Sequence, residues 1–161
     1  MNRRQLVAGL MLLQLALLSG CATLTKDPVT GGKTSNGITI MALADGSTRV
    51  DIATDAAFDY GSAVLRPAFA AQLSQVMKSY SQHPVRVSGF TDNVGAAAFN
   101  LELSRQRAQA IADMLTAQGF NAAQLAVSGY GEGSPVASNA DASGRYRNRR
   151  IELLIMTRTD G

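Results

Sequence analysis

Two short apolar-rich runs open the part of the chain whose pattern predicts folded structure. Residues 38–43 and 48–53 flank Asp45-Gly46, a dipeptide that is typical of hairpin turns. We predict that residues 48–53 form the first core strand and that residues 38–43 are its candidate partner. A loop follows at Phe58-Asp59-Tyr60-Gly61.

A helical period then replaces the strand pattern. Pro67 suits the first turn of a helix, and the residues that mark its apolar face are Phe69, Leu73, Val76, Met77 and Tyr80. Pro84 ends this helix, because a proline disfavours helical backbone in the residue before it. Residues 85–90 alternate between apolar and polar positions and are predicted to form a half-buried strand.

A second helix is predicted from about residue 96 to residue 118, followed by Gly119 as its cap. Its core-facing residues are Leu103, Ala108, Ile111 and Leu115. Strands are predicted at residues 125–130 and 151–156, separated by a polar, glycine-rich loop. The order strand, helix, strand, helix, strand, strand predicts an α+β fold whose helices cover one face of a small mixed sheet.

The N-terminus carries a targeting pattern. Arg3 and Arg4 precede an apolar stretch of 13 residues, 6–18, which is too short for an ordinary transmembrane helix and suits a signal peptide. Leu18-Ser19-Gly20-Cys21 resembles the lipobox of bacterial lipoproteins, which implies cleavage after residues 1–20 and lipidation of Cys21. The alternative is a non-lipidated signal peptide with a chance cysteine, but this is the only cysteine of the chain.

The segment after Cys21 has no hydrophobic period. Residues 22–36 are predicted to be a flexible linker that can stretch to about 50 Å. We assign residues 21–46 to a lipidated tether and linker, and residues 47–161 to one folded domain. By resemblance to bacterial lipoproteins, Ala22 in place of Asp after the cysteine favours the outer membrane. The protein is therefore expected to be lipid-anchored there, with its domain in the periplasm.

Composition narrows the functional classes. Apolar residues make up 46% of the chain, enough for a core. The formal charge of +3 includes Arg3 and Arg4, and without them 13 basic residues face 12 acidic ones. With so little net charge, the chain lacks the positive electrostatic field that is expected of a nucleic-acid-binding protein. His83 and Cys21 are the only His and Cys, so no metal, cofactor or intramolecular disulfide is expected.

Four sequence blocks carry a family resemblance. They are Gly89-Phe90-Thr91-Asp92-Asn93-Val94-Gly95, Asn100-x-x-Leu103-Ser104-x-x-Arg107-Ala108-x-x-Ile111-x-x-x-Leu115, Ser128-Gly129-Tyr130-Gly131-Glu132-x-x-Pro135 and Asn148-Arg149-Arg150-Ile151-Glu152. Over about residues 51–156 the chain thus resembles the OmpA-like C-terminal domain of peptidoglycan-associated lipoproteins and flagellar stator proteins. The resemblance implies a β-α-β-α-β-β sandwich that binds peptidoglycan. Phe90 departs from it by replacing the usual His, which is expected to change either the rim of the pocket or its affinity for the ligand.

Asp92 and Arg107 are the leading candidates for ligand binding. Asp92 lies just beyond a predicted strand and Arg107 lies inside the next helix, so the chain can bring them to opposite ends of one pocket. A carboxylate and a guanidinium suit a zwitterion with ammonium and carboxylate groups. The resemblance implies that this ligand is the meso-diaminopimelate of Gram-negative stem peptides, with Asp92 on its ammonium and Arg107 on its carboxylate. The alternative is a plain Asp92–Arg107 salt bridge.

Four further residues fall at family positions that complete this pocket: Asp59, Thr91, Asn100 and Arg149. Local roles remain open for them, since Asp59 can cap a turn and Asn100 can bind nearby backbone.

The leading hypothesis for function is a non-enzymatic tether between the outer membrane and peptidoglycan. The alternative is an OmpA-like module that binds a periplasmic protein partner in secretion, assembly or signalling. A hydrolase is not supported, because Ser104 has no histidine near it for a nucleophilic triad.

Overall fold

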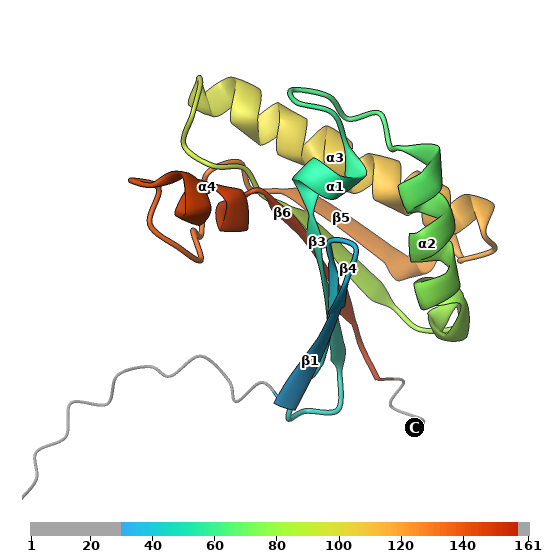
Figure 1. Ribbon diagram of the computed structural model, residues 1–161. Helices are drawn as coiled ribbons and strands as arrows, with labels where there is room; N and C mark the ends of the chain where they lie inside the picture. Colours follow the sequence, from blue (N-terminus) through green and yellow to red (C-terminus); the bar gives the residue numbers. More distant parts are fainter. Residues whose placement is uncertain (1–29, 158–161) are drawn as a thin grey trace, which may run out of the picture.

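The computed structural model describes residues 30–157, which form a six-stranded mixed sheet with helices on it (Figure 1). The strand order is β1-β2-β3-β6-β4-β5, and only the β4–β5 pair is parallel. The strands are β1 (Thr30–Ser35), β2 (Ile38–Ala42), β3 (Thr48–Ala53), β4 (Val85–Gly89), β5 (Leu125–Gly129) and β6 (Arg150–Ile155).

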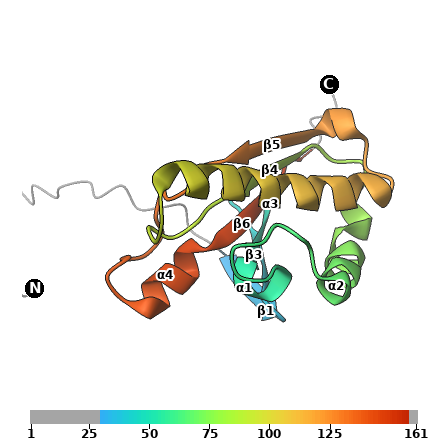
Figure 2. The same cartoon turned by 90° about the horizontal axis from the view of Figure 1, so that it is seen from above.

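The two longer helices lie on one face of this sheet, which confirms the predicted α+β class (Figures 1 and 2). The described residues form four α-helices. They are α1 (Thr54–Ala57), α2 (Pro67–Met77), α3 (Ala97–Ala117) and α4 (Ala142–Asn148), with short 3₁₀ turns at Lys78–Tyr80 and Ala122–Gln124. None of the helices within residues 30–157 combines the length and apolarity that a membrane crossing requires.

The core forms where the apolar stripes of α2 and α3 meet the inner face of the sheet. Leu73 of α2 and Ile111 and Leu115 of α3 are fully buried against strand residues such as Val50 and Leu153. The helical period predicted this packing correctly. Gly119 follows α3 with a φ of 94°, a conformation that glycine adopts without strain.

Two paired glycines allow α3 to lie directly on the sheet. Gly89 of β4 is in register with Gly129 of β5. A Cβ atom on Gly89 would overlap the carbonyl oxygen of Ser104, and one on Gly129 would overlap the backbone of Arg105. Because neither strand carries a side chain here, the middle of α3 approaches the strand ends closely.

The N-terminal part of the sheet differs from the prediction. Strand β1 lies in the segment 22–36 that was predicted to be a flexible linker, whereas β2 coincides with the run 38–43 that was the candidate partner of β3. The sheet therefore begins earlier than residue 47, where the predicted domain starts. Asn36 and Gly37 join these strands, with φ angles of 49° and 80°. Two consecutive positive φ angles are typical of the two-residue hairpin turn that Asn-Gly favours. Cys21 lies outside the described residues.

Candidate functional site

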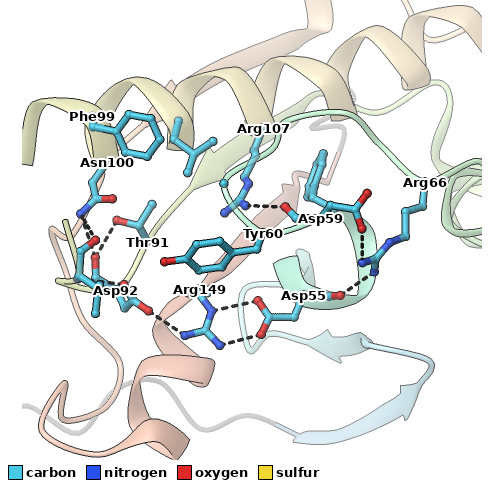
Figure 3. A pocket seen from close by; sticks show the side chains of 14 residues that line it. Asp55, Asp59, Tyr60, Arg66, Thr91, Asp92, Phe99, Asn100, Arg107 and Arg149 are labelled. Carbon is cyan, nitrogen blue, oxygen red and sulfur yellow. Dashed lines mark hydrogen bonds and ion pairs between the residues drawn. The ribbon is translucent and has the colours of Figure 1, made fainter. Parts of the chain in front are cut away.

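A cavity of about 370 Å³ opens where α1, the loop after β4, the first half of α3 and Arg149 meet (Figure 3). The strand register explains this meeting, because Ala53 pairs with Arg150 and Gly89 pairs with Ile151. At this end of the strands, β3 and β4 therefore finish beside the start of β6. The residues predicted as ligand contacts all line this cavity: Asp59, Thr91, Asp92, Asn100, Arg107 and Arg149.

Asp92 is held in a fixed position at the cavity wall. Its side chain is mostly buried, and the residue is 7% exposed. One carboxylate oxygen accepts a hydrogen bond of 3.0 Å from the backbone N–H of Val94, and the other accepts one of 2.7 Å from Arg149. Asn100 steadies the same loop by donating to the carbonyl oxygens of Val94 and Asp92 at 3.1 and 3.4 Å.

Asn100 thus binds local backbone, the alternative that the sequence left open for it. Thr91 has a similar local role, since its hydroxyl donates to the carbonyl of Asp92 at 2.9 Å. Asp59 lies at the outer rim, where its exposed carboxylate forms a 2.7 Å ion pair with Arg66. These contacts shape the wall and the rim of the cavity, whereas the charged groups inside it belong to other residues.

Arg149 links two carboxylates across the cavity. It donates two hydrogen bonds to Asp55, at 2.6 and 2.9 Å, and one of 2.7 Å to Asp92. Thr54 of α1 fixes the same residue from behind, because its backbone N–H and its hydroxyl both donate to the Arg149 carbonyl. The hydrogen bonds from Arg149 lower the pKa of Asp55.

Arg107 is buried and has no carboxylate partner in the part of the chain that the structure describes. It is 5% exposed, and its Nε donates to the carbonyl of Ser62 at 2.8 Å. Its guanidinium carbon lies 5.4 Å from the centre of the Phe58 ring. No carboxylate of residues 30–157 lies within 4.0 Å of its nitrogens. Burial lowers the pKa of this guanidinium, which still stays charged at neutral pH.

The plain Asp92–Arg107 salt bridge is therefore not formed, because Asp92 pairs with Arg149 instead. Negative and positive charge are therefore separated within the cavity. Asp55 and Asp92 share one guanidinium, which leaves an excess negative charge at their end of the cavity. At the other end, Arg107 carries a positive charge that forms no ion pair within residues 30–157, although Asp55 and Asp92 are near enough to raise its pKa. This arrangement suits a ligand that carries an ammonium and a carboxylate a short distance apart.

Asp55 is the residue of this cluster that the sequence prediction missed. It follows the end of β3 by two residues, much as Asp92 follows the end of β4 by three. A sequence signal for Asp55 exists, because it is a carboxylate placed just after a strand, as Asp92 is, and both strands finish at the same end of the sheet. The prediction lacked the pairing of β3 with β6, which decides that these ends are neighbours.

Phe90 has no direct contact with the cavity. Its ring is 6% exposed, stacks on Tyr130 at 5.1 Å, and lies 3.9 Å from the guanidinium carbon of Arg150. Since Gly89 faces α3, the next residue points to the other face of the sheet. Phe90 is therefore not part of the pocket rim, and an effect of Phe90 on ligand affinity stays a prediction.

The described residues hold no group of three or more His, Cys, Asp or Glu side chains arranged for a metal ion. Ser104 is fully buried, donates to the carbonyl of Leu101 and accepts from the N–H of Gly131. It joins α3 to the loop after β5.

The Asp55–Arg149 pair is expected to make stability depend on pH. The folded-state pKa of Asp55 lies below its ordinary value of 3.8, so the pair stabilises the fold above about pH 3.8 and is lost as the pH falls through the lower value. Asp55 is 43% exposed, so solvent screening limits the effect. We expect Asp55→Asn to lower the free energy of unfolding by about 0.5–1 kcal/mol at pH 7.

Denaturant titrations of both proteins at pH 7 and pH 3 measure this difference, which should shrink at the lower pH. Asp113→Asn, on the exposed face of α3, is the matched control. A constant difference at both pH values would contradict the assignment.

Comparisons with known proteins agree with the fold. The OmpA family matches residues 57–149. The probable lipoprotein YiaD of Escherichia coli is 41% identical over 101 residues, which cover 61% of this chain and 46% of YiaD. The peptidoglycan-binding protein ArfA of Mycobacterium tuberculosis is 39% identical over 102 residues, which cover 62% of this chain and 31% of ArfA. The chain thus spans less than half the length of either relative.

A solved structure extends the likeness to three dimensions. The cell wall anchor of the T6SS from Pseudomonas aeruginosa superimposes with a TM-score of 0.67 at 30% identity. The superposition covers 75% of this chain and 88% of that one.

Proposed function

Because the chain belongs to the OmpA family, we propose that its cavity binds peptidoglycan and catalyses no reaction. The observation that carries this proposal is the separation of charge in the cavity. Among residues 30–157, a buried guanidinium without a carboxylate partner lies at one end, and two carboxylates that share one guanidinium lie at the other. ArfA, a relative, is a peptidoglycan-binding protein, which supports the same ligand here.

The part of peptidoglycan that fits these charges is the side-chain end of meso-diaminopimelate. In the proposed complex its ammonium binds Asp92, and its carboxylate binds Arg107. Arg149 keeps the Asp92 carboxylate in place, and Asp55 keeps Arg149 in place. Thr91, Asn100 and Asp59 complete the wall as in the resemblance.

The proposed place of the protein is the periplasmic side of the outer membrane, with Cys21 carrying the lipid. YiaD, a relative, is a probable lipoprotein, which supports an anchor. The sheet begins at Thr30, so eight residues, 22–29, separate it from Cys21. A fully extended chain of that length spans about 28 Å, roughly half of the reach predicted from the sequence.

Lipidation at Cys21 has a direct test. Cells given a fatty-acid analogue should label the wild-type protein and should not label Cys21→Ser, because the variant lacks the thiol that takes the lipid. Ser19→Ala, two residues upstream in the lipobox, keeps the thiol and should be labelled. Equal labelling of wild type and Cys21→Ser would end the lipoprotein proposal.

Co-sedimentation with purified sacculi tests the proposed function itself. The wild-type protein should bind saturably, and soluble stem peptides that contain diaminopimelate should displace it. A protein that binds no sacculi, but is crosslinked to a periplasmic protein equally well after Asp92→Ala, would support the alternative partner-binding function.

A further inference from the structure

Two aromatic side chains stand at the mouth of the cavity with most of their surface exposed. Tyr60 is 93% exposed and Phe99 is 57% exposed, and both line the cavity. They come from different segments, the loop after α1 and the first turn of α3. In Figure 3 the Tyr60 ring extends across the space between Arg107 and Arg149.

The backbone holds Tyr60 in this position although its ring has few contacts. The N–H of Ser62 donates to the carbonyl of Asp59, which closes a turn with Tyr60 at its tip. Gly61, also in this turn, has a φ of 67°. An aromatic ring exposed to this extent gives little hydrophobic stabilisation to the fold, and it gains burial only when another molecule covers it.

The charged groups lie deeper in the cavity than the two aromatic rings. Asp92 and Arg107 are 7% and 5% exposed, whereas the two aromatic rings are at the surface. A zwitterionic head group that reaches the charges therefore lies deeper in the cavity than the two rings. Whatever carries the head group remains beside them.

We propose that Tyr60 and Phe99 form an aromatic clamp on the aliphatic chain that carries the zwitterionic head group. The clamp selects an α-amino acid head group on a chain of several methylenes, such as the side chain of diaminopimelate, over a free amino acid with a short side chain. This inference rests on the proposed function, because it takes the head group to bind at Asp92 and Arg107.

The test compares two zwitterions by NMR titration of the purified protein. Free meso-diaminopimelate offers head group and chain, whereas D-alanine offers a head group with a single methyl group. Wild type should bind diaminopimelate at least tenfold more tightly than D-alanine. Tyr60→Ala and Phe99→Ala should each weaken diaminopimelate binding by about fivefold to tenfold and change D-alanine binding less than twofold.

Two further variants sharpen the result. Tyr60→Phe keeps the ring and should bind like wild type. Val64→Ala removes another exposed apolar side chain, 76% exposed, from the same loop but outside the cavity lining, and should have no effect. Unchanged diaminopimelate binding in both alanine variants would overturn the clamp, as would an equal loss for both ligands.

Asp92→Ala distinguishes the clamp from the proposed function. If Asp92→Ala weakens diaminopimelate binding and the aromatic variants do not, the clamp is wrong and the pocket stands. If Asp92→Ala has no effect on either ligand, the proposed pocket fails, and the clamp fails with it.

Discussion

Arg107→Ala is expected to weaken binding to sacculi by about tenfold to a hundredfold. The guanidinium is buried and has no carboxylate partner among residues 30–157, so a ligand carboxylate would be its counter-ion. A hydrogen bond to a charged group contributes about 1.5–3 kcal/mol, and each 1.4 kcal/mol is about a factor of ten in affinity. Asp92→Ala should cause a similar loss at the other end of the ligand. Asp92→Asn, which keeps an acceptor oxygen but not the charge, should fall between wild type and alanine.

Stability must be measured alongside affinity, because Arg107 also donates to the carbonyl of Ser62. Arg105→Ala is the matched control, since Arg105 lies on the exposed face of the same helix and pairs there with Glu102. It should bind sacculi like wild type. If Arg107→Ala stays folded and also binds like wild type, the role given to Arg107 is wrong.

Gly89→Ala is expected to lower the free energy of unfolding by about 3 kcal/mol, at the upper end of what overpacking a core costs. The new methyl group would overlap the carbonyl of Ser104 in the backbone of α3, and a helix backbone cannot turn aside as a side chain can. The helix must move away from the sheet, and it carries Arg107 with it. Sacculus binding should therefore fall in the same variant.

Chemical denaturation followed by circular dichroism measures the stability loss. Arg86→Ala, an exposed change on the same strand, is the control and should alter stability by less than about 0.5 kcal/mol. If Gly89→Ala unfolds at the same denaturant concentration as wild type, the packing of α3 on the sheet does not depend on this close approach.

The sequence predicts the elements that bury apolar side chains and misses those that do not. Helix α3 has a clear stripe of buried residues, β4 begins with the alternation Val85-Arg86-Val87, and β6 alternates over residues 151–155, so their periods identify them. Strand β1 has the sequence TGGKTS, without a single large apolar residue, and is held by backbone pairing to β2. Its signal was the Asn36-Gly37 turn. Helix α4 was also missed, because its two buried residues are Gly144 and Asn148 rather than an apolar stripe.

At the site, too, the sequence predicted one part and missed another: it predicted the residues but not their contacts. The family resemblance identified six residues that line one cavity, five of them inside the motif blocks, but the sequence could not assign their partners. Asp92 precedes Arg107 by one loop and about three helical turns, yet its ion pair is with Arg149, 57 positions away. This pairing depends on where β6 enters the sheet, which is a tertiary feature. Phe90 illustrates the converse, since a change inside the motif concerns the other face of the sheet.

A comparison of two kinds of sacculi tests the two-ended pocket most directly. Stems with lysine in place of meso-diaminopimelate keep the side-chain ammonium but lack the carboxylate next to it, so Arg107 has nothing to bind. Wild-type protein should bind diaminopimelate-type sacculi at least tenfold more tightly than lysine-type sacculi, and Arg107→Ala should remove most of this preference. Equal binding of wild type to both kinds of sacculi would contradict the pocket, even if binding to peptidoglycan itself remained.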